Sequence, residues 1–166
     1  YRNRVRDLIE YRYDAATFMG SMANVSNATL KGVSLQASTQ WFDWTLAATY
    51  DAQSARNDDS GNFLARRVPR IASVDVARRL GRFDLGAKLQ GFSRRFNDPD
   101  NLRPLGGYGL LSLRGTYRVD KQWSMHATVQ NALDKNYVVA QGSGSPYNDY
   151  ATAGRSYFVT LRYSGL

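Results

Sequence analysis

Hydrophobic and polar residues alternate along most of this chain, so that every second side chain is apolar. The apolar members of the clearest segment, 42–51, are Phe42, Trp44, Leu46, Ala48 and Tyr50. Polar residues fill the intervening positions, and only Ala47 departs from the rule. Because successive side chains of a β-strand point to opposite faces, this period of two predicts a strand with one apolar and one polar face.

The same alternation recurs in four later segments, at residues 83–90, 111–119, 123–130 and 157–163. Less regular versions occur at residues 4–13, 22–38 and 67–80. We therefore expect about eight strands. The spacing of three and four residues that marks an amphipathic helix does not compete with this pattern anywhere. The sequence thus predicts an all-β, antiparallel protein.

The links between the expected strands alternate in length. Short links are expected at 39–41, 81–82 and 120–122, and long ones at 53–64, 96–107 and 133–153. The long links are rich in Gly, Asn, Asp, Ser or Pro. Short turns at one rim and long loops at the other are typical of outer-membrane β-barrels, whose short turns face the periplasm. We therefore expect the long loops to lie outside the cell.

Aromatic residues gather where the expected strands meet the short links. These are Trp41, Phe42, Trp44, Phe83 and Trp123. Amphipathic rings prefer the headgroup layer of a membrane, so this placement predicts an aromatic girdle. A soluble antiparallel barrel or sandwich has the same alternation but buries its apolar face. The loop asymmetry and the aromatic strand ends favour the membrane.

The membrane interpretation assigns a face to each strand residue. The residues expected to face lipid are Trp44, Leu46, Leu85, Leu113, Val129, Val159 and Leu161. Those expected to face the lumen are Asp43, Lys88, Arg114, His126, Gln130 and Arg162. The mean hydropathy of −0.49 agrees with this division, because a membrane strand needs only about ten residues, of which every second one meets lipid.

Composition and charge exclude several kinds of function. The chain has no cysteine, which excludes disulfides and thiolate metal sites. Its formal net charge is +8, mostly from arginines spread over alternate strand positions, and no nucleic-acid-binding motif is present, so we expect no nucleic-acid partner. Arginines suit a wet lumen and the phosphates of lipopolysaccharide at the rims.

No residue pattern indicates catalysis. His126 is the one histidine, and a single imidazole on a strand is more often a structural polar residue than a base or a metal ligand. No nucleophile elbow or phosphate-binding glycine loop occurs, so we expect no enzyme activity, cofactor or metal site. The loop 141–150 combines glycines, polar side chains and two tyrosines, which suits either contact with a polar ring-containing ligand or a plain surface loop.

Several motifs resemble those of TonB-dependent receptors. Residues 131–137, Asn-Ala-Leu-Asp-Lys-Asn-Tyr, resemble the signature of the penultimate strand in that family. Residues 150–157, Tyr-Ala-Thr-Ala-Gly-Arg-Ser-Tyr, resemble the tract that opens the last strand. Residues 30–33 and 65–69 resemble two further strand motifs, with Ser34 in place of an acid in the first, and 105–108 is similar to a tract of the cobalamin-receptor branch.

The resemblance implies a fold and a function. Residues 1–166 are expected to form about eight C-terminal strands of a 22-stranded transmembrane β-barrel in the cell outer membrane. Because 166 residues supply only about eight strands, the resemblance implies that the N-terminal strands and the plug through which TonB acts lie outside this chain. The expected role is active transport of a scarce, bulky ligand.

Cobalamin is the preferred ligand, with a ferric siderophore or haem as alternatives. Haem is disfavoured because the one histidine lies within a strand. Ligand contacts are expected at the extracellular ends, at Arg66, Asn101 and Tyr150. Gly154, Asn131 and Asp134 are expected to be structural.

A different class of function is a complete eight-stranded barrel with a structural or adhesive role. In that case the segments 4–13 and 156–163 pair with each other. Two unpaired edges favour part of a larger barrel instead.

Overall fold

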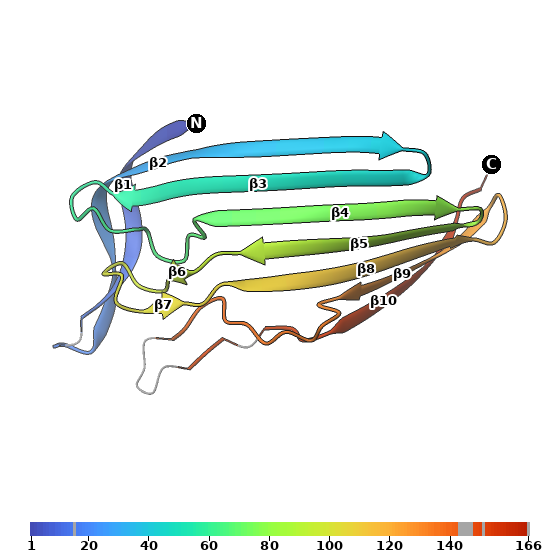
Figure 1. Ribbon diagram of the computed structural model, residues 1–166. Coiled ribbons are helices and arrows are strands. Elements are labelled where there is room, and N and C mark those ends of the chain that lie inside the picture. The colour runs from blue at the N-terminus through green and yellow to red at the C-terminus, as the bar shows by residue number, and fades with distance from the viewer. Residues whose placement is uncertain (15, 143–147, 151, 166) are drawn as a thin grey trace.

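The computed structural model is built of β-strands joined by turns and loops (Figure 1). It describes residues 1–14, 16–142, 148–150 and 152–165, without the side chains of residues 10–13, 23, 25 and 26. In chain order its strands are β1 (Arg2–Asp14), β2 (Met19–Trp41), β3 (Trp44–Asn57), β4 (Arg70–Leu80), β5 (Phe83–Phe92), β6 (Arg95–Phe96), β7 (Pro104–Leu105), β8 (Tyr108–Arg118), β9 (Trp123–Gln130) and β10 (Ser156–Tyr163). The residues that the structure describes include no helix of the length and hydropathy that a membrane crossing needs.

Eight strands form one antiparallel sheet in the order β1-β2-β3-β4-β5-β8-β9-β10. Strands β6 and β7 form a separate two-stranded sheet within the β5–β8 connection. The all-β, antiparallel prediction with about eight strands is therefore confirmed. Strands β1 and β10 are the two edges of the sheet and do not pair with each other, so the closed eight-stranded barrel is wrong.

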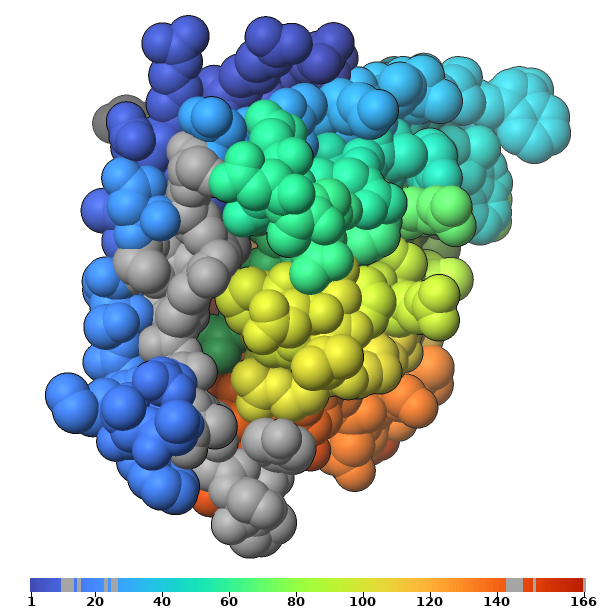
Figure 2. Space-filling view, turned by 90° about the vertical axis from the view of Figure 1, so that its left-hand side faces the viewer, coloured from blue at the N-terminus to red at the C-terminus, as the bar shows by residue number. Residues whose placement is uncertain are grey.

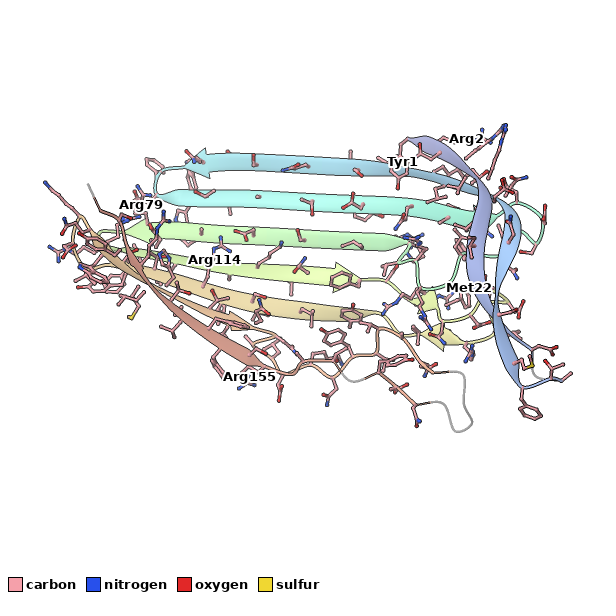
Figure 3. All side chains as sticks on the ribbon, turned by 180° about the vertical axis from the view of Figure 1, so that it is seen from behind. Tyr1, Arg2, Met22, Arg79, Arg114 and Arg155 are labelled. Atoms are coloured by element: carbon pink, nitrogen blue, oxygen red, sulfur yellow. The ribbon has the colours of Figure 1, made fainter. Side chains whose placement is uncertain are left out.

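The register places the apolar residues of neighbouring strands beside one another on one face, here called the outer face. One row joins Leu46, Val76, Ala87, Leu113 and Val129 across five strands. The polar residues share the opposite, inner face. The residues predicted to face the lumen lie on it, except Asp43, which lies in a turn. Figure 3 views the sheet from the side toward which β1 and β10 curve.

The tight turns after β2, β4 and β8 lie at one end of the sheet and the long loops at the other, as the sequence predicted (Figure 1). The turn predicted at 39–41 is wrong, because β2 continues to Trp41 and pairs there with Trp44. Phe42 and Asp43 form the turn instead, and Phe42 adopts a φ of 50°. A non-glycine residue with positive φ gives no local sequence signal, which is why the strand was expected to begin at Phe42.

The first long loop is shorter than predicted, and the second contains regular pairing. The loop expected at 53–64 begins only after Asn57, because residues 53–57 pair with β2. The loop expected at 96–107 contains β7 and the end of β6. In both places Gly, Asn, Asp and Ser suggested a loop. The pairing of residues 53–57 is decided by β2, earlier in the sequence, whereas β6 and β7 pair with each other inside the second loop.

Strand β2 is long because it serves two partners. Its residues 28–41 pair with β3, whereas residues 19–27 pair with β1 alone. The part of the β1–β2 hairpin that lacks a β3 partner extends past the sheet and runs beside the loops (Figures 1 and 2). At its turn, Asp14 accepts hydrogen bonds from the Ala16 amide (2.8 Å) and the Thr17 hydroxyl (3.0 Å), which hold the pKa of Asp14 below its usual range.

The buried core lies at the long-loop end and is small. Ala28, Ala55 and Leu64 form one cluster, with Leu8 and Leu30 packed against it. The buried polar and charged residues are Asn57, Arg95, Asn97, Asp98 and Asn131. The interior of the described structure is thus made mainly of connections between strands.

Candidate functional site

Three loops meet at the long-loop end, above the inner face of the sheet. They are residues 58–69 between β3 and β4, 93–107 between β5 and β8, and 131–155 between β9 and β10. Figure 2 looks onto this end and shows the first two loops side by side. We call the contacts among these loops the loop cluster.

Asn97 is the centre of the loop cluster. Its side-chain oxygen accepts hydrogen bonds from the Gln141 amide (2.9 Å) and from Nε of Arg66 (3.3 Å). Its side-chain nitrogen donates to the carbonyl of Gln141 (3.1 Å). One buried amide therefore joins all three loops, which explains its burial to 4% exposure.

A second buried side chain, Asp98, shapes the middle loop. Its carboxylate accepts hydrogen bonds from the backbone amides of Leu102 (2.9 Å) and Arg103 (2.6 Å). The guanidinium of Arg103 lies 3.6 Å from the same carboxylate and donates to the carbonyl of Gly142 (3.2 Å). The middle loop is thereby closed on itself and attached to the last loop.

Arg95 is a buried cation in the cluster. Its NH2 group donates to the carbonyl of Val138 (2.9 Å), and its guanidinium lies 5.5 Å from the centre of the Tyr108 ring. The Tyr108 ring stacks on Phe92 and contacts Tyr137 in a tilted arrangement. Among the described residues, NH1 of Arg95 has no hydrogen-bond partner. A buried donor without a partner is costly, so this position favours an added acceptor or anion.

The structure brings two of the predicted site residues into the cluster. Arg66 is exposed, has a φ of 60° and joins Asn97 as described. Asn101 is braced more fully, because its side chain accepts from the amide of Phe63 and donates to the carbonyl of the same residue, both at 2.8 Å.

Tyr150, the third predicted site residue, is 58% exposed on the last loop, and its amide donates to the carbonyl of Ala140. Residues 143–147 of the predicted 141–150 loop lie outside the described residues. Arg95 and Asn97 were missed by the sequence reasoning. The signal that was available was the polar composition of the segment around them.

The motif residues near the last strand have structural roles, as expected. Asn131 holds the turn after β9 by bonding both backbone groups of Lys135 (2.9 and 3.0 Å). Asp134 accepts from the Arg155 amide (2.8 Å), which aligns the start of β10. A Cβ added at Gly154 would meet this carboxylate at 2.9 Å. Glycine therefore permits the close approach.

The inner face carries a network of ion pairs. Arg114 on β8 crosses β5 above Gly86 and forms two hydrogen bonds with Asp75 on β4 (2.5 and 2.7 Å). Asp84 on β5 pairs with both Arg79 and Arg118. Figure 3 labels Arg79 and Arg114. Such a surface suits water or a polar filling better than an apolar core.

His126 belongs to the same face and is held by two hydroxyls. Its ring nitrogens lie 2.9 Å from Thr116 Oγ1 and 3.0 Å from Ser124 Oγ. Nothing in this arrangement resembles a general base aimed at a substrate. In the part of the chain that the structure describes, no three His, Cys, Asp or Glu side chains gather as metal ligands would.

Comparisons with known proteins identify relatives of this arrangement. A family model described as TonB dependent receptor-like, beta-barrel matches residues 1–132. The vitamin B12 transporter BtuB of Vibrio vulnificus strain YJ016 is 27% identical over 165 residues, which cover 98% of this chain and 26% of that protein.

Solved structures show the same fold. The copper transporter OprC has 24% identity and a TM-score of 0.81, over 98% of this chain and 27% of that chain. The ferric yersiniabactin uptake receptor FyuA from Yersinia pestis has 16% identity and a TM-score of 0.81, over 98% and 26% of the two chains. This chain therefore spans about a quarter of the length of these relatives.

Proposed function

We propose that this chain, which belongs to the TonB-dependent receptor β-barrel family, forms part of the wall of an outer-membrane receptor that imports cobalamin. The remaining barrel strands and the plug that engages TonB come from sequence outside these 166 residues. Strands β1 and β10, which are edges here, pair with those further strands in the complete barrel.

The exposed apolar outer face is the observation that carries the membrane part of this proposal. Its residues Leu89, Val159 and Leu161 are 54%, 72% and 63% exposed. Water-soluble proteins rarely expose a continuous apolar surface of this kind, whereas a barrel wall requires one against lipid. The ion pairs of the inner face agree with a hydrated or plug-filled lumen.

The loop cluster supports the ligand-binding part. Arg66 and Tyr150 are exposed at this end, so we assign them to direct ligand contact. Asn101 contributes by holding the loop that carries Phe63, because its polar atoms are already bonded to backbone groups. Cobalamin is preferred because a vitamin B12 transporter is 27% identical to this chain.

A ferric siderophore is the second candidate, because FyuA, a ferric yersiniabactin uptake receptor, shares the fold at a TM-score of 0.81. The two ligands are separated by titrating the full-length receptor with each. We expect cobalamin to bind and the ferric chelate to fail. Binding of the ferric chelate without cobalamin would overturn the preference.

The same titration tests the assigned residues. Arg66→Ala and Tyr150→Ala should each weaken cobalamin binding by about fivefold or more, which is the loss of a contact worth about 1 kcal/mol. Arg162→Ala, on the inner face of β10, is the control and should leave the affinity unchanged.

A further inference from the structure

Charged residues are distributed unequally between the two faces of the sheet. The acidic residues of strands β3, β4 and β5 are Asp51, Asp75 and Asp84, and the register places all of them on the inner face. Strands β8, β9 and β10 contain no acidic residue. The outer-face charges of the same six strands are all basic, namely Arg56, Arg70 and Arg78.

Arg78 is set apart from the other two. Arg56 and Arg70 lie at the long-loop end, whereas Arg78 lies near the tight turns. Arg70 and Arg78 are eight positions apart on β4, a distance of about 26 Å at the rise of a strand. Because the strands of membrane barrels tilt by about 35 to 45°, this length spans about 20 Å along the membrane normal, which is comparable to the roughly 25 Å height of the apolar band. Between them the outer face of β4 carries Ala72, Val74 and Val76.

Arg78 rests on an aromatic ring. The register places it directly beside Trp44 on β3, and its guanidinium lies 5.0 Å from the centre of that ring. Trp41, the last residue of β2, pairs with Trp44 of β3, and its ring contacts that of Phe42 in the turn. On its other side Arg78 is opposite Leu85. Within the described part of the chain, Arg78 forms no ion pair.

These neighbours define the ligand chemistry. An unpaired cation beside an apolar band must reach the headgroup layer, where the available anion is a lipid phosphate. A planar guanidinium can bind a phosphate through two hydrogen bonds while its face rests on an aromatic ring. Tryptophan prefers the same layer.

We propose that Arg78 and Trp44 form a binding site for the phosphate of a glycerophospholipid in the leaflet at the tight-turn rim. The site rests on the outer-membrane role proposed above. It gives the exposed guanidinium of Arg78 a lipid phosphate as its partner.

The test uses the full-length receptor in a maltoside detergent, which carries no phosphate. Dioctanoyl phosphatidylglycerol is titrated, with dioctanoylglycerol as the matched lipid without phosphate, and bound lipid is counted by native mass spectrometry. We expect the phosphate lipid alone to bind at this site. Arg78→Gln should weaken it roughly fivefold, the usual contribution of one basic residue at a membrane surface. Trp44→Leu should weaken it about twofold to fivefold through loss of the ring.

Lys88→Gln, a charge removal on the inner face of the neighbouring strand, is the control and should have no effect. Equal affinity in Arg78→Gln and the parent, or an equal loss in Lys88→Gln, would overturn the site. A nitroxide at position 46 tests the membrane role separately. If that label lacked access to lipid-dissolved oxygen, the outer-membrane assignment would be contradicted, whatever the lipid titration showed.

Discussion

Single residues at the long-loop end replace the hydrogen bonds that a neighbouring strand would supply. Asn101 pairs with both backbone groups of Phe63, and Asn97 does the same for Gln141. A side-chain amide can do this because it carries a donor and an acceptor at the spacing of a peptide group. The positive φ of Asn101, 59°, is also tolerated best by asparagine among non-glycine residues. These residues therefore hold loops whose backbones do not pair directly.

Gly107 and Gly106 form a matched pair for testing close packing at the start of β8. A Cβ at Gly107 would lie 2.7 Å from the carbonyl oxygen of Phe92, whereas nothing lies within 4 Å of one at Gly106. Gly107→Ala should therefore lower the free energy of unfolding of the full-length receptor by about 1 to 3 kcal/mol. Gly106→Ala should change it little. Urea unfolding in lipid vesicles measures both, and equal midpoints would contradict the close approach.

Strand β2 shows how one element can have two levels of stability. Residues 28–31 pair with β1 on one side and β3 on the other, whereas residues 19–27 are hydrogen-bonded to β1 alone and residues 33–41 to β3 alone. A two-stranded ribbon buries little apolar surface and is marginal by itself. The β1–β2 hairpin beyond the sheet is therefore the part of the element most able to open locally.

Hydrogen exchange followed by mass spectrometry tests this difference. Amides of residues 19–27 should exchange faster than those of residues 44–52 of β3, because the ribbon is paired on one side only, whereas those β3 residues have a partner strand on each side. Residues 28–31 of β2, which have both partners, are the reference within the same strand. Uniform protection along β2 would contradict the prediction.

The whole sheet has its apolar and polar faces arranged opposite to those of a water-soluble domain. Its apolar face is on the outside and largely exposed, and its ion pairs are on the inner face. The fully buried hydrophobic residues among the described ones are Ala28, Ala55, Leu64 and Leu105, all at the long-loop end. Too little apolar surface is buried there to stabilise an isolated sheet, which agrees with the lipid contact proposed above for the outer face.

Arginine substitutions distinguish the two faces. Leu113→Arg on the outer face should lower the free energy of unfolding in lipid vesicles by about 2 to 4 kcal/mol, the cost of a charge near the bilayer midplane. Thr45→Arg on the inner face should have only a small effect, because its side chain meets water or polar groups. If Thr45→Arg were the more damaging of the two, the faces would be assigned the wrong way round.

The sequence by itself determined the eight main strands, the faces of their residues and the end of the sheet that carries long loops, although not the turn at Phe42 and Asp43 or the end of β3. These features depend on the local alternation of apolar and polar residues along each strand. Leu85, Leu113 and Leu161 illustrate it, because each belongs to the apolar set of its segment. It also identified Asn131 and Asp134 as turn residues, because short side chains that bond to nearby backbone act within a few positions.

Only the tertiary structure decided which loops meet and which residues join them. The contacts of Asn97 with Arg66 and Gln141 span 31 and 44 positions, and that of Asn101 with Phe63 spans 38. No local pattern encodes such distances, because they follow from the order of strands in the sheet. The same is true of Arg78, whose position beside Trp44 results from the β3–β4 register and turns an ordinary arginine into a candidate lipid contact.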